Sequence, residues 1–301
     1  MSKLVVTGGD GFIGSHLVDA LVERGDEVHI IDTCIANGGK NLNKKAIHHN
    51  ADIRNFSAIR PIFDQARFIF HLAALPRIQP SIENPSEYHD TNVTGTLNVL
   101  RASRDAKVKR VIFSSSSSVY GDQTLFPMKE SAPIKPKNPY AAQKLMGEIY
   151  CSLFSSLYGL ETASLRYFNV YGLRQPHEGA YAVLVGIFLK QWSEGKPMTI
   201  VPDGKQSRDF THVSDVIRAN IFAMESDRVL TGDSINIGTG KEYSVLEVAG
   251  MIGGDTVYIQ PRSGEAMRSK ADRTRAKELL RWEPLIELPL AIAELKSAYK
   301  K

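Results

Sequence analysis

A tyrosine and a lysine four positions apart, Tyr140 and Lys144, are the residues of this chain best suited to moving a proton. Positions i and i+4 of a helix lie on the same face, so the lysine ammonium can lie beside the phenol and favour the phenolate. The pKa of the tyrosine, ordinarily about 10, would then move toward neutral pH, and the phenolate could accept a proton from a substrate hydroxyl. A surface helix with an incidental Tyr/Lys pair is the alternative interpretation.

Three glycines near the start of the chain, Gly8, Gly11 and Gly14, indicate a loop that binds a phosphate group. They follow an apolar run at residues 4–6 and precede a helical pattern. Glycine lets the backbone approach a ligand without a Cβ in the way, and the first turn of a helix offers unpaired N–H groups. Strand, glycines and helix in this order predict a dinucleotide site. A glycine-rich turn in another kind of α/β protein is the alternative.

An acidic residue, Asp32, ends the second apolar run at residues 28–31. In a dinucleotide-binding fold an acid at this place accepts hydrogen bonds from a ribose. A carboxylate there would also repel a 2′-phosphate, so the sequence predicts NAD rather than NADP.

Strand and helix patterns alternate along the first part of the chain. Apolar runs at residues 67–73, 110–113 and 160–166 predict further strands, and helices are expected over 57–65, 87–106 and 140–158. This alternation predicts an α/β fold of the Rossmann type, with a doubly wound parallel sheet. We expect residues 1–168 to form this domain, with segments near 210–240 returning to it.

The second part of the chain has shorter elements. We expect helices at residues 180–195, 213–224, 271–280 and 288–299, and strands at 198–201, 234–238 and 257–260. Residues 169–301 should therefore form mainly a smaller substrate-binding α/β lobe.

Composition excludes several classes of protein. The net charge of +4 comes from scattered basic residues, with no basic stripe for nucleic acid. No apolar run approaches the ~20 residues of a membrane span, and we expect no signal peptide. Cys34 and Cys151 match no metal-ligand spacing, so reduced thiols and a cytoplasmic location are the expectation, and a single disulfide between them is the alternative.

These features together make the chain resemble the extended short-chain dehydrogenase/reductase family, and more narrowly its nucleotide-sugar epimerases. The resemblance covers almost the whole chain. It rests on these segments: Thr7-Gly-Gly-Asp-Gly-Phe-Ile-Gly14, His71-Leu-Ala-Ala74, Asn92-Val-Thr-Gly-Thr96, Ser114 to Gly121, Tyr140 with Lys144, Arg166-Tyr-Phe-Asn-Val-Tyr-Gly172, Asp203 to Phe210, Asn236-Ile-Gly238 and Pro261-Arg-Ser-Gly-Glu265.

The resemblance implies a cofactor, NAD, and a site for it. The implied cofactor residues are Gly8, Gly11, Phe12, Ile13 and Gly14 at the pyrophosphate, Asp32 at the adenosine ribose, Asp52 and Ile53 at the adenine, Leu72, Ala73 and Ala74 along the path to the nicotinamide, Lys144 at the nicotinamide ribose, and also Asn37, Tyr140 and Tyr167.

It also implies the catalytic and substrate residues. Tyr140 would be the base, with Lys144 and Ser116 as its catalytic partners. The implied substrate residues are Ser116, Tyr140, Asn169, Arg208, Arg262 and Glu265, together with Ser269, where a small side chain would leave room for an N-acetyl group.

Two departures from the family bear on activity. The dehydratase relatives place Asp and Glu where this chain has Ser117 and Ser118, so the acid and base for eliminating water are missing. The segment at residues 201–203 also lacks the usual glycine before Asp203.

We therefore expect NAD-dependent 4-epimerisation of a UDP-hexose through a 4-keto sugar. A 4-keto reductase or decarboxylase of the same family is the alternative enzyme, and a non-catalytic NAD-binding regulator is the alternative of another class. We also expect a homodimer, because the helices at 87–106 and 140–158 carry more apolar residues than one sheet face needs: Val93, Leu97, Leu145, Met146, Ile149, Leu153 and Leu157.

Overall fold

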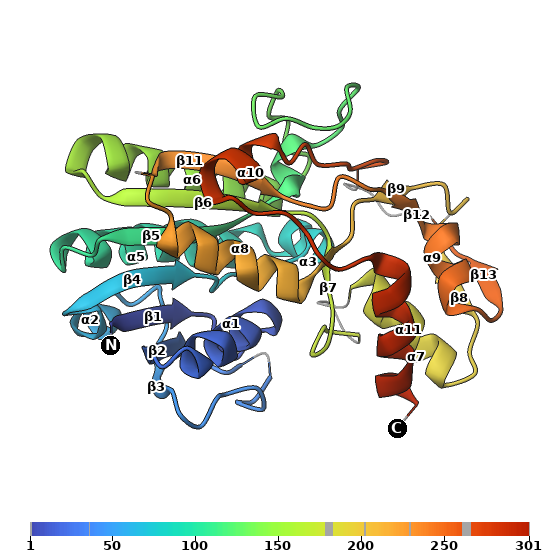
Figure 1. Cartoon of the computed structure of the whole chain (residues 1–301), viewed down its shortest axis with the longest axis horizontal. Coiled ribbons are helices and arrows are strands. Elements are labelled where there is room, and N and C mark those ends of the chain that lie inside the picture. The colour runs from blue at the N-terminus through green and yellow to red at the C-terminus, as the bar shows by residue number, and fades with distance from the viewer. Residues whose placement is uncertain are drawn as a thin grey trace.

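A parallel sheet of seven strands, in the order β11-β6-β5-β4-β1-β2-β3, forms the centre of the molecule (Figure 1). This computed structural model describes residues 2–35, 37–177, 183–201, 203–228, 230–260 and 266–300. The predicted Rossmann-type fold is confirmed. The strands are β1 (Lys3–Thr7), β2 (Glu27–Asp32), β3 (Ile47–Asn50), β4 (Ala66–His71), β5 (Arg110–Ser116), β6 (Glu161–Tyr167) and β11 (Thr231–Ile237).

Helices cover both faces of this sheet, which explains why residues 4–6 of the inner strand β1 form an unbroken apolar run. In β1, Leu4 and Val6 pack on one face and Val5 on the other. The first face carries α1 (Phe12–Glu23), α8 (Val213–Glu225) and α10 (Thr274–Leu280). The second face carries α2 (Phe56–Ile59), η1 (Arg60–Phe63), α5 (Gly95–Asp105) and α6 (Pro139–Tyr158).

The helix expected over residues 87–106 is not a single regular helix. It consists of α4 (Pro85–His89), a π-helical turn η2 (Asp90–Thr94) and α5. A π-helical turn accommodates an extra residue and is frequent at functional sites. Here the side chain of Asn92, within the turn, bonds both the backbone N–H and the carbonyl of Leu75, at 2.8 and 3.0 Å.

Several elements were not predicted, among them β3 and α3. The strand β3 has the polar sequence Ile-His-His-Asn and is largely exposed, because it is the last strand at one edge of the sheet. The short helix α3 (Ile78–Glu83) lies in a segment for which no helix was expected. Another short turn, η3 (Ser117–Tyr120), follows β5.

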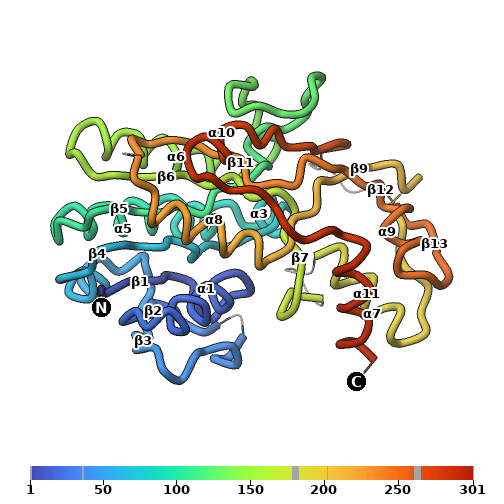
Figure 2. The backbone as a smooth tube through the Cα atoms, viewed as in Figure 1, coloured from blue at the N-terminus to red at the C-terminus, as the bar shows by residue number. Residues whose placement is uncertain are grey.

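The chain leaves the sheet after β6 and returns to it more than once, as the trace in Figure 2 shows. A second core lies between α7 (Leu184–Ser193), β8 (Met198–Ile200), α9 (Val245–Ile252) and α11 (Leu288–Tyr299). Between these segments, α8 and β11 run back to the sheet, where β11 pairs with β6. The remaining short strands are β7 (Val170–Tyr171), β9 (Ser207–Arg208), β10 (Thr211–His212), β12 (Tyr243–Ser244) and β13 (Thr256–Tyr258).

A buried carboxylate joins the two parts. Asp215, in the first turn of α8, accepts the backbone N–H groups of Leu285 and Ile286, each at 3.0 Å. The indole N–H of the fully buried Trp282 donates to the carbonyl of Asp215 at 2.9 Å. The segment between α10 and α11 is thereby held against α8 (Figure 1).

No helix in the described part of the chain has the length and apolar character to cross a membrane. Nor do the described residues include a cluster of three or more His, Cys, Asp or Glu side chains that could hold a metal ion.

Candidate active site

The loop between β1 and α1 closes so tightly that glycine is required at two positions. Gly8 has φ +77°, and a Cβ on it would lie 2.7 Å from the backbone nitrogen of Ala73. A Cβ on Gly14 would lie 2.0 Å from the carbonyl oxygen of Gly8. Gly11 is the N-cap of α1 and makes no side-chain cap hydrogen bond. The loop and the helix N-terminus therefore fit a dinucleotide diphosphate. Two further predicted cofactor residues begin α1: Phe12 and Ile13.

A pair of aspartates organises the segment after β2. The Asp32 carboxylate accepts the backbone N–H of Asp10 at 2.9 Å and that of Cys34 at 2.7 Å. Asp10 is itself buried, and its carboxylate accepts the N–H groups of Gly39 and Asn41, both at 2.9 Å. The Asn37 side chain donates to the Asp10 carbonyl at 2.7 Å. Asp10 thus holds the loop beside Asp32, a role hidden in the sequence because Asp10 lies inside the glycine motif.

The predicted adenine residues follow β3. Asp52 accepts hydrogen bonds from the Arg54 guanidinium at 2.9 and 2.6 Å, and these bonds lower the pKa of Asp52. Ile53 is buried beneath α5, where a Cβ on Gly95 would lie 2.5 Å from its Cδ1 atom. Asp52 and Ile53 thus lie at the edge of the sheet that Asp32 also faces.

The predicted path to the nicotinamide begins directly after β4. The N–H of Leu72 donates to the carbonyl of Thr7 at 3.1 Å, which continues the pairing of β4 with β1. Leu72, Ala73 and Ala74 are all half-buried. This segment therefore runs beside the glycine loop.

A chain of hydrogen bonds through a buried histidine fixes this segment. The N–H of Ala73 donates to Thr7 Oγ1 at 3.1 Å, and Thr7 Oγ1 lies 2.8 Å from His71 Nδ1. His71 Nε2 lies 2.9 Å from Thr96 Oγ1, which donates to the carbonyl of Asn92 at 2.6 Å. Because the Thr96 proton is used on that carbonyl, we assign His71 as a neutral ring that donates from Nε2.

The structure brings the three predicted catalytic side chains together at the carboxyl end of β5. The N-terminus of α6 is capped by the Asn138 side chain, which accepts the N–H of Ala141 at 2.9 Å. In the first turn of α6, Tyr140 makes a side-chain hydrogen bond with Ser116. One turn later, Lys144 Nζ donates to the Ser114 carbonyl at 2.7 Å. The lysine nitrogen lies 5.9 Å from the centre of the Tyr140 ring.

The pKa of Tyr140 differs from the sequence-based expectation. Burial raises it, and the groups that oppose this rise are Arg77 and Ser116 rather than Lys144. Burial also lowers the pKa of Lys144 to about 8, so the ammonium is still present at neutral pH. The expectation missed the effect of desolvation, which no sequence pattern reports.

Arg77 is the site residue that sequence analysis missed. It precedes α3 with φ 92° and ψ 148°, a conformation that a non-glycine residue rarely adopts. Its neighbours hold it there: the Tyr88 hydroxyl donates to the Pro76 carbonyl at 2.7 Å, and Leu75 is bound by Asn92. Strain of this kind concentrates at functional sites. A basic residue between prolines soon after the His71-Leu-Ala-Ala74 segment was the available signal.

The predicted substrate residues meet beyond β6. Asn169, with φ 24°, donates from Nδ2 to the Asp209 carbonyl at 3.1 Å and to Ser269 Oγ at 3.2 Å. Ser269 is 8% exposed, and its hydroxyl oxygen also accepts the N–H of Asp209 at 3.4 Å. The Arg208 guanidinium donates to the carbonyls of Ser207 and Met267, at 3.0 and 3.2 Å.

Tyr167, a predicted cofactor residue, stands apart from this group. The Tyr167 hydroxyl exchanges hydrogen bonds with Asn220 of α8 at 2.8 and 3.0 Å, so it faces the core of the first sheet face. Burial raises the pKa of Tyr167 to about 12. Arg262 and Glu265 lie outside the residues that the structure describes.

Comparison with protein families gives one clear match. Residues 4–238 match the model of the NAD dependent epimerase/dehydratase family. That range contains the glycine loop, Asp32, Tyr140 with Lys144, and Asn169. It also contains the run of five serines at residues 114–118, called the serine segment below.

Individual relatives match over nearly the whole chain. A putative UDP-glucose 4-epimerase of Methanocaldococcus jannaschii is 40% identical over 293 residues, covering 95% of this chain and 94% of its own length. A crystal structure of UDP-glucose 4-epimerase from Thermotoga maritima with UDP-glucose superposes with a TM-score of 0.94 at 36% identity, covering 99% of this chain and 98% of that one. UDP-N-acetylglucosamine 4-epimerase of Methanobrevibacter ruminantium, in complex with UDP-N-acetylmuramic acid, has a TM-score of 0.93 at 34% identity, covering 98% and 97%.

The neutral state of His71 predicts a loss of stability in acid. Burial and the nearby Lys144 charge lower the His71 pKa from 6.5 to about 3. Between these values the unfolded chain takes up a proton that the folded chain does not, so the free energy of unfolding should fall by about 1.4 kcal/mol for each pH unit below 6.5. Urea unfolding from pH 7 to pH 5 measures this slope. In His71→Asn the slope should be smaller by that amount, whereas in the control His89→Asn, an exposed histidine, it should not change. Equal slopes in the wild type and His71→Asn would contradict the assignment.

Proposed function

Because the chain belongs to the NAD dependent epimerase/dehydratase family, we propose that it inverts carbon 4 of a UDP-hexose. The observation that carries this proposal is the grouping of Tyr140, Ser116 and Lys144 at the end of the sheet that carries the glycine loop. Ser117 and Ser118 occupy the places where an elimination would need carboxyl groups. The relatives named 4-epimerases of UDP-sugars support the same reaction.

The chain's own side chains supply the proton transfer. Gly8, Gly11, Gly14 and Asp32 would hold NAD, which would supply the acceptor and donor for the hydride of carbon 4. Tyr140 takes the proton from the 4-hydroxyl, and the Ser116 hydroxyl donates a hydrogen bond to the same oxygen. The Arg77 charge and the Ser116 hydroxyl favour the tyrosinate against the cost of burial, and the Lys144 ammonium would bind the nicotinamide ribose. Tyr140 returns the proton when the second face is reduced.

The diphosphate of the substrate must stay bound while the sugar turns. We assign the diphosphate and the nucleoside attached to it to Arg208 and Asn169, which lie around Ser269, and to Arg262 and Glu265. A guanidinium suits a diphosphate because it presents several donors in a fixed plane.

The cytoplasm remains the predicted location. Both cysteines, Cys34 and Cys151, are free thiols, and Cys151 is fully buried. Free thiols are typical of a reducing compartment.

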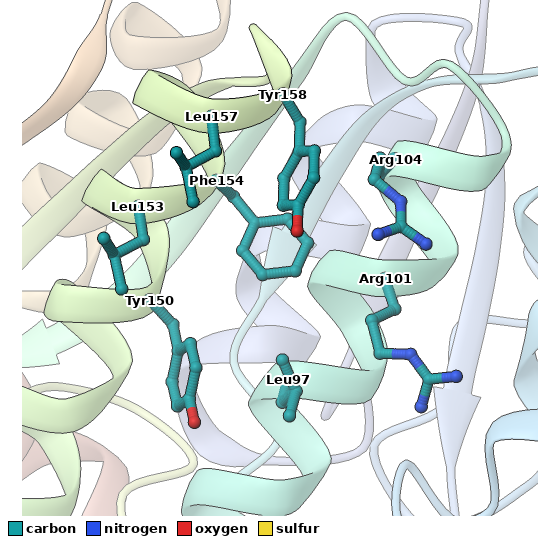
Figure 3. Close-up of a pocket in the computed structure, with 8 residues that line it drawn as sticks. All are labelled: Leu97, Arg101, Arg104, Tyr150, Leu153, Phe154, Leu157 and Tyr158. Carbon is teal, nitrogen blue, oxygen red and sulfur yellow. The ribbon is translucent and has the colours of Figure 1, made fainter.

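A second copy of the chain is the proposed partner of α6. Its outer face carries an exposed apolar stripe with helical spacing, formed by Met146, Ile149, Leu153 and Leu157. Beside the stripe, α5 and α6 form a groove of about 280 Å³ (Figure 3). The groove is lined by Leu97, Arg101, Arg104, Tyr150, Leu153, Phe154, Leu157 and Tyr158.

Stripe and groove lie on one face, so a two-fold axis can place each stripe in the partner's groove, as in a four-helix bundle. Two residues expected in this face lie elsewhere. Val93 is buried, and Leu145 packs in a small cluster with Met128 and Phe168.

The role of Tyr140 can be tested by removing one oxygen. Tyr140→Phe keeps the ring and its packing but loses the group that accepts the proton. We expect turnover of UDP-glucose to fall by roughly 10²–10⁴, with little change in UDP-sugar affinity measured by calorimetry. Tyr150→Phe, in the groove away from the site, should keep full turnover. Near-normal turnover in Tyr140→Phe would show that another group is the base.

The small side chain of Ser269 should leave room for an N-acetyl sugar. We expect UDP-N-acetylglucosamine to be epimerised at least as well as UDP-glucose. Ser269→Tyr should lower kcat/KM for the N-acetyl substrate at least roughly tenfold more than for UDP-glucose, because the ring would clash with the larger 2-substituent. Ser269→Ala, which keeps the space, should retain both activities in their original ratio. An equal loss of both substrates in Ser269→Tyr would remove this residue from the specificity argument.

The dimer can be tested with two leucines that are equally exposed. Leu157 on α6 and Leu290 on α11 are both 67% exposed. Leu157→Glu places a charge in the proposed interface, so light scattering at micromolar concentration should give a dimer mass for the wild type and a monomer mass for this variant. Leu290→Glu should stay dimeric. A monomeric wild type is the result that would exclude the dimer at this concentration.

A further inference from the structure

A buried ion pair lies beneath the catalytic residues and is not used by the mechanism above. Glu148 of α6 and Arg166 of β6 have side chains only 6% and 5% exposed. The guanidinium binds the carboxylate in a bidentate manner, with Nε–Oε1 at 2.9 Å and Nη2–Oε2 at 2.7 Å. Two hydroxyls also donate to this carboxylate: Ser115 Oγ to Oε1, and Ser234 Oγ to Oε2 at 3.1 Å. Four donors on two oxygens are the pattern of a carboxylate.

Stability alone does not account for such a pair. The cost of burying two charges can exceed their mutual attraction, and apolar residues of similar volume often replace a buried ion pair without loss. What a hydrogen-bonded pair does supply is a fixed geometry. Arg166 also donates to the Tyr120 hydroxyl at 2.8 Å, and that hydroxyl donates to Asn236 Oδ1 at 2.6 Å. The pair therefore fixes α6 against β5, β6 and β11 at once.

The pair acts on the same serine segment that the catalytic residues use. Tyr140, Lys144 and Glu148 follow one another at intervals of four on one face of α6. Each of them binds the end of β5: Tyr140 through the Ser116 side chain, Lys144 through the Ser114 carbonyl, and Glu148 through the Ser115 hydroxyl. The contact made by Glu148 lies between the other two along the strand.

We propose that Glu148, held by Arg166, is a positioning residue for the epimerase reaction: it fixes the serine segment through Ser115 and supplies the negative charge that balances the Lys144 ammonium. The inference deepens the proposed function and rests on it, because turnover is its first readout.

The other groups that face Lys144 do not supply this charge. Burial raises the pKa of Cys151 to about 12 and lowers that of His71 to about 3, so both are neutral at pH 7. Burial also raises the pKa of Tyr140. Burial lowers the Lys144 pKa, and Cys151, as a thiolate, and Glu148 oppose this effect. With the thiol protonated, the Glu148 carboxylate remains the opposing charge, while Arg166 and Arg77 add positive charge from β6 and from the segment before α3.

The charge is tested by the pH profile of kcat. Glu148→Gln keeps the shape of the side chain, and we expect the alkaline limb of the profile to move toward neutral pH by about one pH unit or more. Glu130→Gln is the matched control: Glu130 accepts the backbone N–H of Asn236 at 2.8 Å in the same buried cluster but has no bond to the serine segment. Its alkaline limb should stay in place. If Glu148→Gln does not fold, Arg166→Gln tests the same charge with the opposite sign: without the guanidinium, the Glu148 carboxylate acts on Lys144 unopposed, so the alkaline limb should move away from neutral pH.

The positioning is tested by Ser115→Ala, which leaves both charges in place. We expect kcat to fall roughly tenfold, with unchanged KM, an unchanged alkaline limb and an unchanged content of bound NAD. A purely structural role would lower the melting temperature and leave kcat as it was. An unshifted limb in Glu148→Gln, or a wild-type kcat in Ser115→Ala, would overturn the corresponding part of the proposal.

One readout does not depend on turnover. The pH at which Lys144 becomes reactive toward acetic anhydride, followed by mass spectrometry of its peptide, reports the loss of its proton. Glu148→Gln should lower this pH, and Glu130→Gln should not. If the wild type shows no epimerase activity, the proposed function fails, and this measurement still decides whether Glu148 balances the charge of Lys144.

Discussion

The docking of one face of α6 onto the end of β5 is the contact on which the active site depends. The helix presents a tyrosine, a lysine and a glutamate at intervals of four, and three consecutive serines of the strand contact them. The helix binds three groups of the serine segment: the Ser116 side chain, the Ser114 carbonyl and the Ser115 hydroxyl. Because these three contacts share one rigid helix, a displacement of α6 along the strand would disturb all of them together.

Buried polar groups carry much of the local specificity. His71, Asp10, Asp209 and Asp215 are almost fully buried, and each is hydrogen-bonded to backbone or hydroxyl groups of distant segments. An unsatisfied buried group of this kind costs about 1–3 kcal/mol. Each of these side chains therefore permits few arrangements of the loops around it, and those loops form the cofactor and substrate sides of the site.

The path of the chain explains how the second part is held over the first. Along the chain, α7 and β8 of the second part come before α8 and β11, which pack on and pair with the sheet. Asp209, in the connection that leads back to the sheet, accepts the N–H groups of Thr239, Gly240 and Ala271. Segments that are far apart in sequence thus meet around one carboxylate, next to Asn169 and Ser269.

The sequence by itself determined the sheet, the glycine loop and the Tyr140/Lys144 pair, because these follow from periodicity and short spacings. It missed β3, since an exposed edge strand has no apolar pattern, and the π-helical turn, in which Asn92 bonds Leu75 of another segment. Only the tertiary structure decided three features: the pKa of Tyr140, the effect of the Arg77 charge on it, and the Glu148–Arg166 ion pair. Desolvation and charge contacts arise between residues far apart in the chain, and a local pattern of residue types contains no information about them.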